Sequence, residues 1–328
     1  MILVTGGAGF IGSNLVAGLQ DEGVASVAVC DRLGAEDKWR NLGKRGLDEV
    51  VAPEGLGDFL RSSGELVRYV FHMGAVSATT ERDADLIIET NLRLSQTLWR
   101  WCAQSGVPLV YASSAATYGD GTGGFDDDGS QAALSLLRPM NAYAWSKHLF
   151  DRWVARRVSE GDDAPPQWVG LKFFNVYGPN EYHKGDMMSV VCKAYPQAAA
   201  GDPVTLFRSH KDEYPDGGQV RDFVYVGDCV RVMLWLMKNR HVSGLFNVGT
   251  GRGQTFQELI GALFAALGHE PRVNWIDMPV EIRDRYQYYT QAEMSRLYSA
   301  GYDLPFLTVE DGVKDYVVNY LATDDPYR

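Results

Sequence analysis

The chain has 328 residues, of which 45% are apolar, and it carries a formal net charge of −11 at pH 7. This length and apolar content suit one large or two moderate globular domains with a substantial core. The negative charge argues against nucleic acid and anionic membranes as main partners. No apolar run reaches the roughly 20 residues of a membrane span, and the chain opens on a strand-like segment without the features of a secretion signal. We therefore expect a cytoplasmic protein.

The four cysteines are scattered, with no paired spacing and no neighbouring set of histidines. This pattern predicts buried free thiols in a reducing compartment and no metal site. The residues concerned are Cys30, Cys102, Cys192 and Cys229.

The first half of the chain alternates short β-rich runs with helical patterns, which predicts a parallel sheet covered by helices. The expected strands are 1–5, 26–31, 69–73, 109–113 and 168–174. The expected helices are 12–22, about 84–104 and 141–159.

The amino-acid composition changes after Asn175, where glycine, proline and polar residues dominate 177–220. We expect a helix near 189–200, strands at 221–226 and 245–248, and helices at 256–267 and 309–321. The polar runs 126–128 and 211–218 are predicted to be solvated loops.

A glycine-rich segment, Thr5-Gly-Gly-Ala-Gly-Phe-Ile-Gly12, follows the first strand and opens the first helix. Gly6 and the glycine after it permit a tight turn, Gly9 lets backbone approach a pyrophosphate, and Gly12 allows close packing of helix and strand. Asp31 ends the second strand at the distance expected of a ribose ligand. The segment therefore predicts a dinucleotide site that also includes Phe10 and Ile11.

The sequence leaves the choice of nicotinamide cofactor open. Asp31 would favour NAD by bonding a ribose 2′-hydroxyl, whereas Arg32 and Lys38 would favour NADP by pairing with a 2′-phosphate, unless they are ordinary surface charges. After the third strand, a run of small residues is expected to pass the cofactor: Met73, Gly74, Ala75, Val76 and Ser77. Asn91 would either hydrogen-bond backbone there or be a buried amide without a ligand role.

Tyr143 and Lys147 are four residues apart on a predicted helix and so share one face. An ammonium beside a phenol favours the phenolate, so we expect Lys147 to lower the pKa of Tyr143 and make it a general acid or base. Lys147 has a second candidate role at the nicotinamide ribose. Ser113 and Ser114 end a strand at the carboxyl edge of the sheet, where a serine hydroxyl can hold a substrate oxygen near Tyr143.

Taken together, the segments 6–12, 113–119, 143–147 and 174–179 resemble the extended short-chain dehydrogenases that act on nucleotide sugars. The dehydratases of that superfamily carry an acidic pair after the serine, and this chain has Ala115-Ala116, which argues against dehydration. The stretch from Asn175 to Gly185 is similar to the ADP-glyceromanno-heptose 6-epimerase family, as are 221–228, 246–251 and Arg285-Tyr286-Gln287.

The resemblance implies an α/β fold with a Rossmann-like doubly wound parallel sheet and a smaller mixed α/β substrate-binding domain. We assign 1–173, 223–251 and about 300–306 to the NADP-binding domain, and 174–222, 252–299 and 307–328 to the substrate domain. It also implies a homo-oligomer, with a pentamer among the options, and a small-molecule substrate, ADP-heptose.

Lys184 is implied as the second acid/base. An epimerase that oxidises and re-reduces one carbon must return hydride to the opposite face, and a second proton carrier on that side permits this. From spacing alone, a surface or phosphate-binding lysine is the alternative. The resemblance also places Val176 and Lys184 at the cofactor. It implies substrate contacts at Ser77, Ser114, Asn175, Asp186, Lys193, Phe207, Arg208, Ser209, His210, Arg221 and Tyr286.

The implied reaction is epimerisation at C6 of ADP-D-glycero-D-manno-heptose through a transient NADP-dependent oxidation to a 6-keto sugar. Two alternatives remain at this point. One is another nucleotide-sugar epimerase or reductase, such as a UDP-hexose 4-epimerase, and the other is a non-catalytic NADP-binding sensor.

Overall fold

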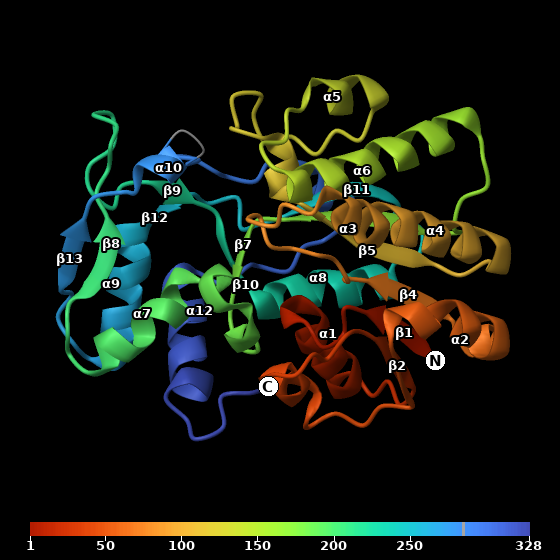
Figure 1. The fold of residues 1–328 in the computed structure, drawn as a ribbon, viewed down its shortest axis with the longest axis horizontal. Helices are drawn as coiled ribbons and strands as arrows, with labels where there is room; N and C mark the ends of the chain where they lie inside the picture. The colour runs from red at the N-terminus through yellow and green to blue at the C-terminus, as the bar shows by residue number, and fades with distance from the viewer. Residues whose placement is uncertain (284–285) are drawn as a thin grey trace.

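The computed structural model describes residues 1–283 and 286–328, and Figure 1 shows the arrangement of its elements. Arg285 of the quoted Arg-Tyr-Gln run lies outside the described residues. A seven-stranded sheet with the order β11-β6-β5-β4-β1-β2-β3 forms the centre, and all its neighbouring strands run parallel. The strands are β1 (Ile2–Thr5), β2 (Val27–Cys30), β3 (Glu49–Val51), β4 (Tyr69–His72), β5 (Leu109–Ser114), β6 (Trp168–Phe173) and β11 (Gly244–Val248).

Helices cover both faces of this sheet because its strands are apolar on both sides. On one face, Val4 and Phe71 pack with residues of α1 (Phe10–Asp21) and α8 (Val226–Lys238). On the other face, Leu3 and Val70 pack with α2 (Leu56–Ser63), α4 (Leu94–Ser105) and α6 (Ala142–Glu160). The two sets lie on opposite sides of the sheet in Figure 1, which confirms the doubly wound architecture.

The predicted first-half elements are present, with shifts at their ends. Helix α1 starts at Phe10, two residues earlier than expected, because Gly9 is extended and serves as the N-cap. The predicted helix at 84–104 is a continuous run of α3 (Ala84–Ile87), a π-helical segment η4 (Ile88–Arg93) and α4. Asn141 caps α6 by accepting a hydrogen bond from the backbone N–H of Ala144.

The predicted strand at 221–226 is interrupted at Asp222 and ends at Tyr225, one residue earlier than predicted. Two short strands, β9 (Val220–Arg221) and β10 (Phe223–Tyr225), are followed at Val226 by the 13-residue helix α8, which the sequence reading missed. The run Val-Arg-Val-Met-Leu-Trp-Leu-Met in α8 is almost entirely apolar, and a short apolar run is typical of buried strands as well as buried helices.

The second half adds a smaller apolar cluster beside the sheet. Helices α7 (Val190–Ala199), α9 (Phe256–Leu267) and α12 (Val309–Tyr316) pack together with β8 (Val204–Phe207). Strand β8 pairs in parallel with β13 (Val273–Ile276), and β7 (Asn175–Tyr177) pairs with β10. Short elements complete the described chain: β12 (Gln254–Thr255), α5 (Gln131–Leu136), α10 (Val280–Arg283), α11 (Ser295–Ser299), and the 3₁₀ or π turns η1 (Asp37–Leu42), η2 (Pro53–Gly55), η3 (Gly64–Leu66), η5 (Ala115–Tyr118), η6 (Tyr182–Met187) and η7 (Val317–Leu321).

The acidic run 126–128 was predicted to be a solvated loop, and for Asp127 this is wrong. Asp127 is buried and accepts a hydrogen bond from the backbone N–H of Asn247 in β11 at 2.7 Å. The four cysteines are buried free thiols, as predicted. Within the described ranges, no helix has the length and apolar character required to cross a membrane.

Candidate active site

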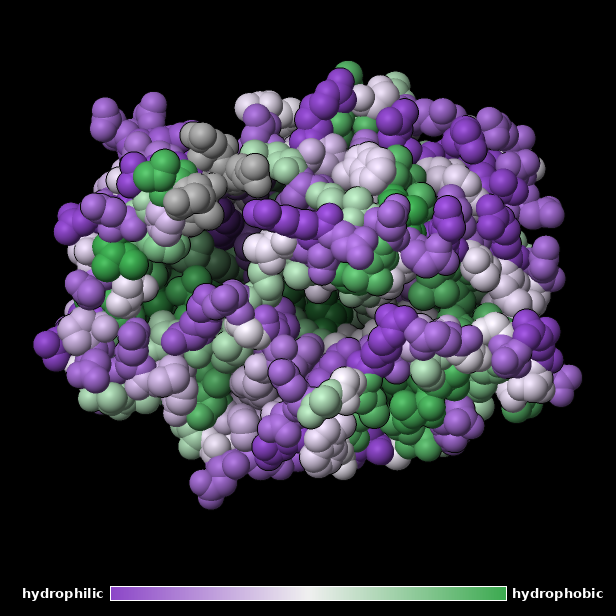
Figure 2. Space-filling model, in the orientation of Figure 1, coloured by the Kyte–Doolittle hydropathy of each residue, from purple (hydrophilic) through white to green (hydrophobic). Residues whose placement is uncertain are grey.

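A cavity of about 730 Å³ lies at the carboxyl edge of the central sheet, between the sheet and the cluster of α7 and α9. Figure 2 shows the hollow on this face of the molecule, with hydrophobic side chains recessed between hydrophilic rims. Its lining includes most of the predicted cofactor and catalytic residues: Gly6, Gly9, Phe10, Ile11, Gly12, Asp31, Lys38, Met73, Gly74, Ala75, Val76, Ser77, Ser114, Tyr143, Lys147, Asn175, Val176 and Lys184.

The glycine turn is built so that backbone alone faces the cavity. Gly6 has φ +66°, and a Cβ there would lie 2.5 Å from the backbone nitrogen of Gly74. A Cβ on Gly12 would lie 2.1 Å from the carbonyl oxygen of Gly6. Close backbone packing therefore requires glycine at both positions, and the tight turn leads into the N-terminus of α1, which fits the pyrophosphate of a dinucleotide.

Asp31 directly follows β2, and each of its carboxylate oxygens accepts a hydrogen bond. Oδ2 accepts from the backbone N–H of Ala8 at 2.9 Å, and Oδ1 accepts from Lys38 Nζ at 2.7 Å. Arg32 is more than half exposed, pairs with Glu54 and is not part of the cavity lining. The structure thus brings Asp31 and Lys38 together at the cofactor side and leaves Arg32 outside.

Asn91 does not line the cavity but shapes its wall from the π-helical segment. Its Oδ1 accepts from the backbone N–H of Val76 at 2.8 Å, and its Nδ2 donates to the carbonyl of Val76 at 3.0 Å. The same Nδ2 donates to Ser146 Oγ of α6 at 3.0 Å. The backbone-bonding alternative predicted for Asn91 is therefore the one observed.

The first turns of α6 bring Tyr143 and Lys147 to the end of β5, beside Ser114. Lys147 Nζ donates to the carbonyl of Ala112 at 2.8 Å. Ser114 Oγ accepts from the backbone N–H of Ala116 at 3.1 Å, so Ser114 also caps the turn η5. The three predicted catalytic groups thus meet at one corner of the cavity.

The predicted fall in the pKa of Tyr143 is wrong for this geometry. Burial raises the pKa of the Tyr143 phenol, the Ser114 hydroxyl acts in the opposite direction, and the carboxylate of Asp151 raises it further. Burial also lowers the pKa of Lys147 from 10.5 to about 8, against an opposing effect of Asp151. Loss of water around each group is the largest cause of both shifts, and the spacing rule does not take it into account.

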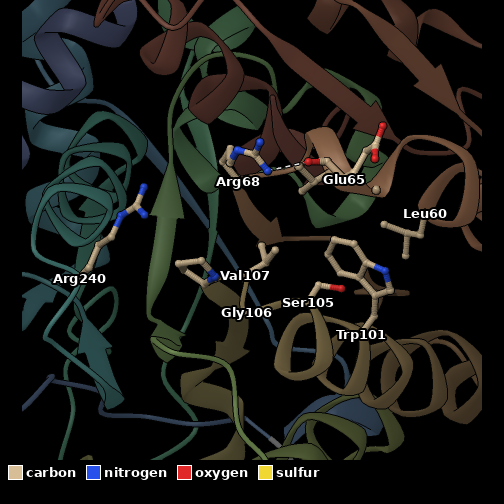
Figure 3. Close-up of a pocket in the computed structure, with 11 residues that line it drawn as sticks. Leu60, Glu65, Arg68, Trp101, Ser105, Gly106, Val107 and Arg240 are labelled. Carbon is tan, nitrogen blue, oxygen red and sulfur yellow. Dashed lines mark hydrogen bonds between the residues drawn. The ribbon is translucent and has the colours of Figure 1, made fainter.

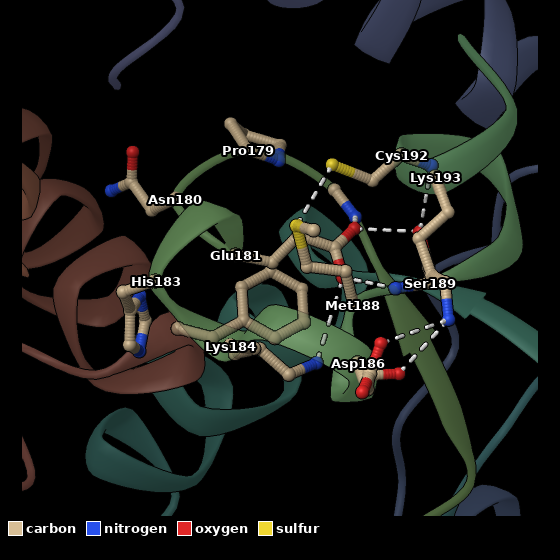
Figure 4. A network of polar contacts seen from close by, with 12 residues as sticks. Pro179, Asn180, Glu181, His183, Lys184, Asp186, Met188, Ser189, Cys192 and Lys193 are labelled. Carbon is tan, nitrogen blue, oxygen red and sulfur yellow. Dashed lines mark hydrogen bonds and ion pairs between the residues drawn. The ribbon is translucent and has the colours of Figure 1, made fainter.

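Lys184 lies on η6, and Figure 4 shows the polar network that holds this segment. Its Nζ lies 3.5 Å from Glu181 Oε2, and the Glu181 side chain is fully buried. Glu181 also accepts from the backbone N–H of Ser189 at 2.6 Å and from Ser189 Oγ at 2.7 Å. The turn carrying Lys184 is therefore tied to the start of α7, and the lysine is neither free on the surface nor deeply buried.

A second cavity of about 470 Å³ adjoins the first and shares Val190 and Phe256 with it. Four predicted substrate residues contribute to its lining: Lys193, Phe207, Arg221 and Tyr286. The guanidinium of Arg221 lies 5.2 Å from the ring centroid of Tyr286 and 5.7 Å from that of Phe256. Burial lowers the pKa of Arg221, and its Nη1 donates to the carbonyl of Val220 at 2.8 Å.

Three further predicted substrate residues, Ser77, Ser114 and Asn175, line the first cavity. The remaining four lie outside both linings: Asp186, Arg208, Ser209 and His210. Arg208 pairs with Asp216 and Asp277, Ser209 donates to the carbonyl of Lys211, and His210 Nδ1 lies 2.7 Å from the hydroxyl of Tyr288. The Asp186 side chain is fully exposed and lies 4.0 Å from Lys193 Nζ. The backbone carbonyl of Asp186 also accepts from Lys193 at 3.2 Å.

Sequence reasoning missed two buried acids near the site. Asp151 of α6 accepts from Ser113 Oγ at 2.6 Å and pairs with Lys172 at 3.1 Å. Asp222 accepts from the backbone N–H groups of Thr250, Gly251 and Ala292, at 2.7, 2.9 and 2.9 Å. Asp151 continues the four-residue spacing from Tyr143 through Lys147, and that repeat is the signal that could have found it.

A third cavity of about 410 Å³ lies at the opposite, amino edge of the sheet, before β4 and β5 (Figure 3). Trp101, Arg68 and Arg240 contribute to its lining. None of the predicted site residues lines it, so the chemistry belongs to the first two cavities.

The doubly wound sheet, the glycine turn and the Tyr143–Lys147–Ser114 corner define an enzyme of the Rossmann class that uses a nicotinamide cofactor. Comparison with known proteins agrees. The chain matches the NAD dependent epimerase/dehydratase family over residues 2–249. It is 49% identical to the ADP-L-glycero-D-manno-heptose-6-epimerase of Nitratidesulfovibrio vulgaris and 43% identical to that of Fusobacterium nucleatum, in each case over 100% of both chains. The chain belongs to the NAD dependent epimerase/dehydratase family, and within it to the branch of the ADP-L-glycero-D-manno-heptose-6-epimerases.

Two solved structures support the same assignment. The Helicobacter pylori ADP-L-glycero-D-manno-heptose-6-epimerase has a TM-score of 0.79 at 31% identity, covering 97% of this chain and 95% of that chain. The Thermus thermophilus UDP-glucose 4-epimerase, in complex with NAD, has a TM-score of 0.74 at 31% identity, covering 96% of this chain and 97% of that chain.

Proposed function

We propose that the protein inverts C6 of ADP-D-glycero-D-manno-heptose through a transient 6-keto sugar, with Tyr143 and Lys184 as its two acid/base groups. The observation that carries the proposal is that both groups line one cavity, one from α6 and one from η6, with the predicted cofactor residues between them in the lining. The full-length relatives named as ADP-heptose epimerases favour this substrate.

When bound in its oxidised form, the nicotinamide cofactor supplies a hydride acceptor and a positively charged ring. Tyr143 takes the proton of the sugar hydroxyl as the hydride leaves, and Ser114 orients the oxygen. Because burial raises the pKa of Tyr143, its ionisation depends on positive charge nearby, which includes Lys147.

Lys184 acts as the proton donor on the opposite face of the reacting carbon. After the ketone turns in the pocket, hydride returns to its other face and the new alkoxide takes a proton from Lys184. The pair with Glu181 holds this ammonium in position. Ala115 and Ala116 follow Ser114 in η5, so no acid is present there to expel water.

We propose NADP as the preferred cofactor, with NAD as the alternative. Gly6, Gly9 and Gly12 would hold the pyrophosphate, and Lys38 would meet a 2′-phosphate. Asp31 is already engaged by Ala8 and Lys38, so its charge is partly neutralised and repels a phosphate less. Binding of NADP and NAD to the purified protein, compared by titration calorimetry, would decide between them.

We further propose that the second cavity holds the nucleoside diphosphate. Arg221 and Lys193 supply positive charge, while Phe207, Phe256 and Tyr286 supply apolar and aromatic surface. The two cavities adjoin at Val190 and Phe256, so one extended ligand can reach from Tyr286 to Tyr143.

The apolar clusters support a division into a cofactor domain and a smaller substrate domain, because two clusters cover the faces of the sheet and a third gathers α7, α9 and α12. Ala292, Met294 and Leu297, which were assigned to the substrate domain, pack with the sheet. A homo-oligomer and a cytoplasmic location, where activated sugars and nicotinamide cofactors are available together, complete the proposal. Light scattering of the purified protein would measure the oligomer.

The test is to incubate the purified protein with ADP-D-glycero-D-manno-heptose and follow C6 by NMR. We expect interconversion of the two C6 epimers without net change in the nicotinamide cofactor. No inversion of the heptose, together with turnover of UDP-glucose to UDP-galactose, would favour the hexose 4-epimerase instead.

A further inference from the structure

The helix α6 carries three polar side chains at successive four-residue steps, Tyr143, Lys147 and Asp151. The first two line the cofactor cavity. Asp151 lies one turn further, is only 1% exposed, and is not part of the cavity lining. The proposed acid/base chemistry therefore leaves Asp151 without an assigned role.

Asp151 is the centre of a buried hydrogen-bond network. Ser113 Oγ donates to Oδ2 at 2.6 Å, and the hydroxyl of Tyr111 donates to Oδ1 at 3.2 Å. Lys172 Nζ of β6 lies 3.1 Å from Oδ2 and donates to Thr117 Oγ1 at 2.6 Å. The side chains of Lys172 and Asp151 are 1% and 0% exposed, so this ion pair is screened from water.

The network joins consecutive residues of β5 to α6. Tyr111 and Ser113 bond Asp151, while the carbonyl of Ala112 accepts from Lys147. The next residue, Ser114, adjoins Tyr143 at the mouth of the cavity. A rotation or slide of α6 that moved Tyr143 away from Ser114 would break the bonds to Asp151 at the same time.

Stability alone does not account for such a pair. Taking two charges out of water costs free energy that their attraction only partly offsets, and well-packed apolar residues in the same place are often as stabilising. An apolar substitute would supply neither the directed hydrogen bonds from β5 nor the negative charge one turn from Lys147.

We propose that Asp151, held by Lys172, is a positioning residue of the active site: it fixes α6 against β5 and places a negative charge one helical turn from Lys147. The inference rests on the proposed function for the roles of Tyr143 and Lys147. It adds a residue that touches neither cavity and acts through groups that do.

The charges around Asp151 are consistent with this role. Asp151 raises the pKa of Lys147 against the larger lowering by burial, and it raises the pKa of Tyr143 in the same direction as burial. The other titratable or charged groups that face this network are His148 and Arg152 on α6, Tyr111 on β5, Lys172 on β6, Tyr118 on η5 and His72 on β4. Asp151 is the carboxylate that acts on both Lys147 and Tyr143.

The test is Asp151→Asn in the full-length protein, because this change keeps the shape and removes the charge. Loss of the charge lowers the pKa of Lys147 and of Tyr143, and the unpaired Lys172 acts in the same direction. We expect the alkaline limb of kcat/KM to move to lower pH by about one unit, which lowers activity at pH 8 about fivefold. Cofactor affinity is expected to stay within about threefold of the original.

Glu160→Gln is the matched control, since Glu160 is an exposed carboxylate at the far end of α6. It is expected to leave both kcat and the pH profile unchanged. Tyr111→Phe is the variant to use if Asp151→Asn does not fold, because it removes one hydrogen bond to Asp151 without leaving a charge unpaired. We expect it to lower kcat by about three- to tenfold with an unchanged KM.

A direct measurement separates this inference from the proposed function. Tyrosine labelled with ¹³C at Cζ reports the ionisation of Tyr143 by NMR, with Tyr143→Phe to assign the signal. Asp151→Asn should lower the pKa of Tyr143 whether or not the protein acts on ADP-heptose. A folded Asp151→Asn protein with an unmoved tyrosine titration and an unmoved pH profile would overturn the positioning role, even if its activity were reduced.

Discussion

The ammonium of Lys184 lies over the ring of Phe10, with Nζ 4.6 Å from the ring centroid. Phe10 is the first residue of α1, directly after the glycine turn, so the proposed second acid/base contacts the element that would hold the cofactor pyrophosphate. A cation over an aromatic ring is attracted by the ring quadrupole. The contact with Phe10 and the pair with Glu181 fix Lys184 from two sides, which favours a positioned proton carrier over a surface lysine.

Replacement of Lys184 should therefore remove inversion rather than binding. For Lys184→Gln we expect kcat to fall by roughly 10²–10⁴-fold, the range for loss of a general acid or base, with cofactor affinity nearly unchanged. The measurement is the rate of epimer interconversion by NMR. Lys193→Gln is the comparison, since Lys193 lies in the second cavity, and it should raise KM more than it lowers kcat. A fully active Lys184→Gln enzyme would remove Lys184 from the mechanism.

Tyr143→Phe should abolish turnover and leave the protein folded. The phenyl ring keeps the packing of the buried side chain, while the proton carrier is lost, so kcat should fall by about 10²–10⁴-fold with the nicotinamide cofactor still bound. Turnover and cofactor content measured on one preparation check this. If the protein were a sensor rather than an enzyme, the substitution would have no effect on any ligand response.

The alkaline limit of activity should reflect Lys147. Its pKa is lowered from 10.5 to about 8 by burial, so the ammonium loses its proton as the pH rises through that value. We expect kcat/KM to fall with rising pH above about 8. Lys147→Met should be poorly active at every pH. A profile that stays flat to pH 10 would show that the charge of Lys147 is not required.

Arg221 is expected to contribute to the affinity for the diphosphate. Arg221→Ala should raise KM for the nucleotide sugar by roughly 10- to 100-fold, as expected for loss of a charge-assisted contact of about 1.5–3 kcal/mol. Arg208→Ala is the control, because Arg208 is about half exposed and pairs with Asp216 and Asp277 outside the cavity. Equal KM values for the two variants would argue against the second cavity as the nucleotide site.

Asp127 should make stability depend on pH. Burial raises its pKa from 3.8 to about 6, so the folded chain holds this proton more tightly than the unfolded chain. The resulting stabilisation is complete below the unfolded value of 3.8 and is lost as the pH rises through 6.

Asp127→Asn removes this pH dependence while its amide oxygen can still accept from Asn247. We expect the variant to gain up to about 3 kcal/mol relative to the original protein, with the gain developing between pH 4 and 6 and reduced by loss of the partly exposed Arg296 partner. Urea unfolding at pH 4 and pH 8 measures it. A variant less stable at pH 8 would show that the ion pair with Arg296 outweighs burial.

Site features that depend only on neighbouring residues in the chain could be predicted from the sequence. The glycine turn, the strand-end serine and the Tyr143–Lys147 spacing each depend on one element and its neighbour, and the structure brings them to one cavity. Helix α8 was missed because its sequence is largely apolar, and a short apolar run is typical of buried strands as well as buried helices. The protonation behaviour of Tyr143 was predicted in the wrong direction, because pair spacing shows the neighbour but not the loss of water around both groups.

Contacts that depend on distant segments were also beyond sequence reasoning. The pairing of Asp151 with Lys172, and the burial of Asp127 against β11, are set by packing between elements far apart in the chain. The Phe207–His210 run shows that residues adjacent in sequence need not share a site. Its four residues are adjacent in sequence, yet only Phe207 lines the second cavity, because the chain leaves strand β8 at that point.

The short parallel pair β8–β13 is separate from the seven-stranded sheet. It carries Leu206, Phe207 and Ile276 of the second cavity, while the proposed acid/base groups Tyr143 and Lys184 lie on α6 and η6. The proposal thus assigns selectivity and reactivity to different parts of the fold. Engineering this scaffold toward other activated sugars should therefore begin with libraries at β8 and β13, where a failed variant loses a substrate without losing the chemistry.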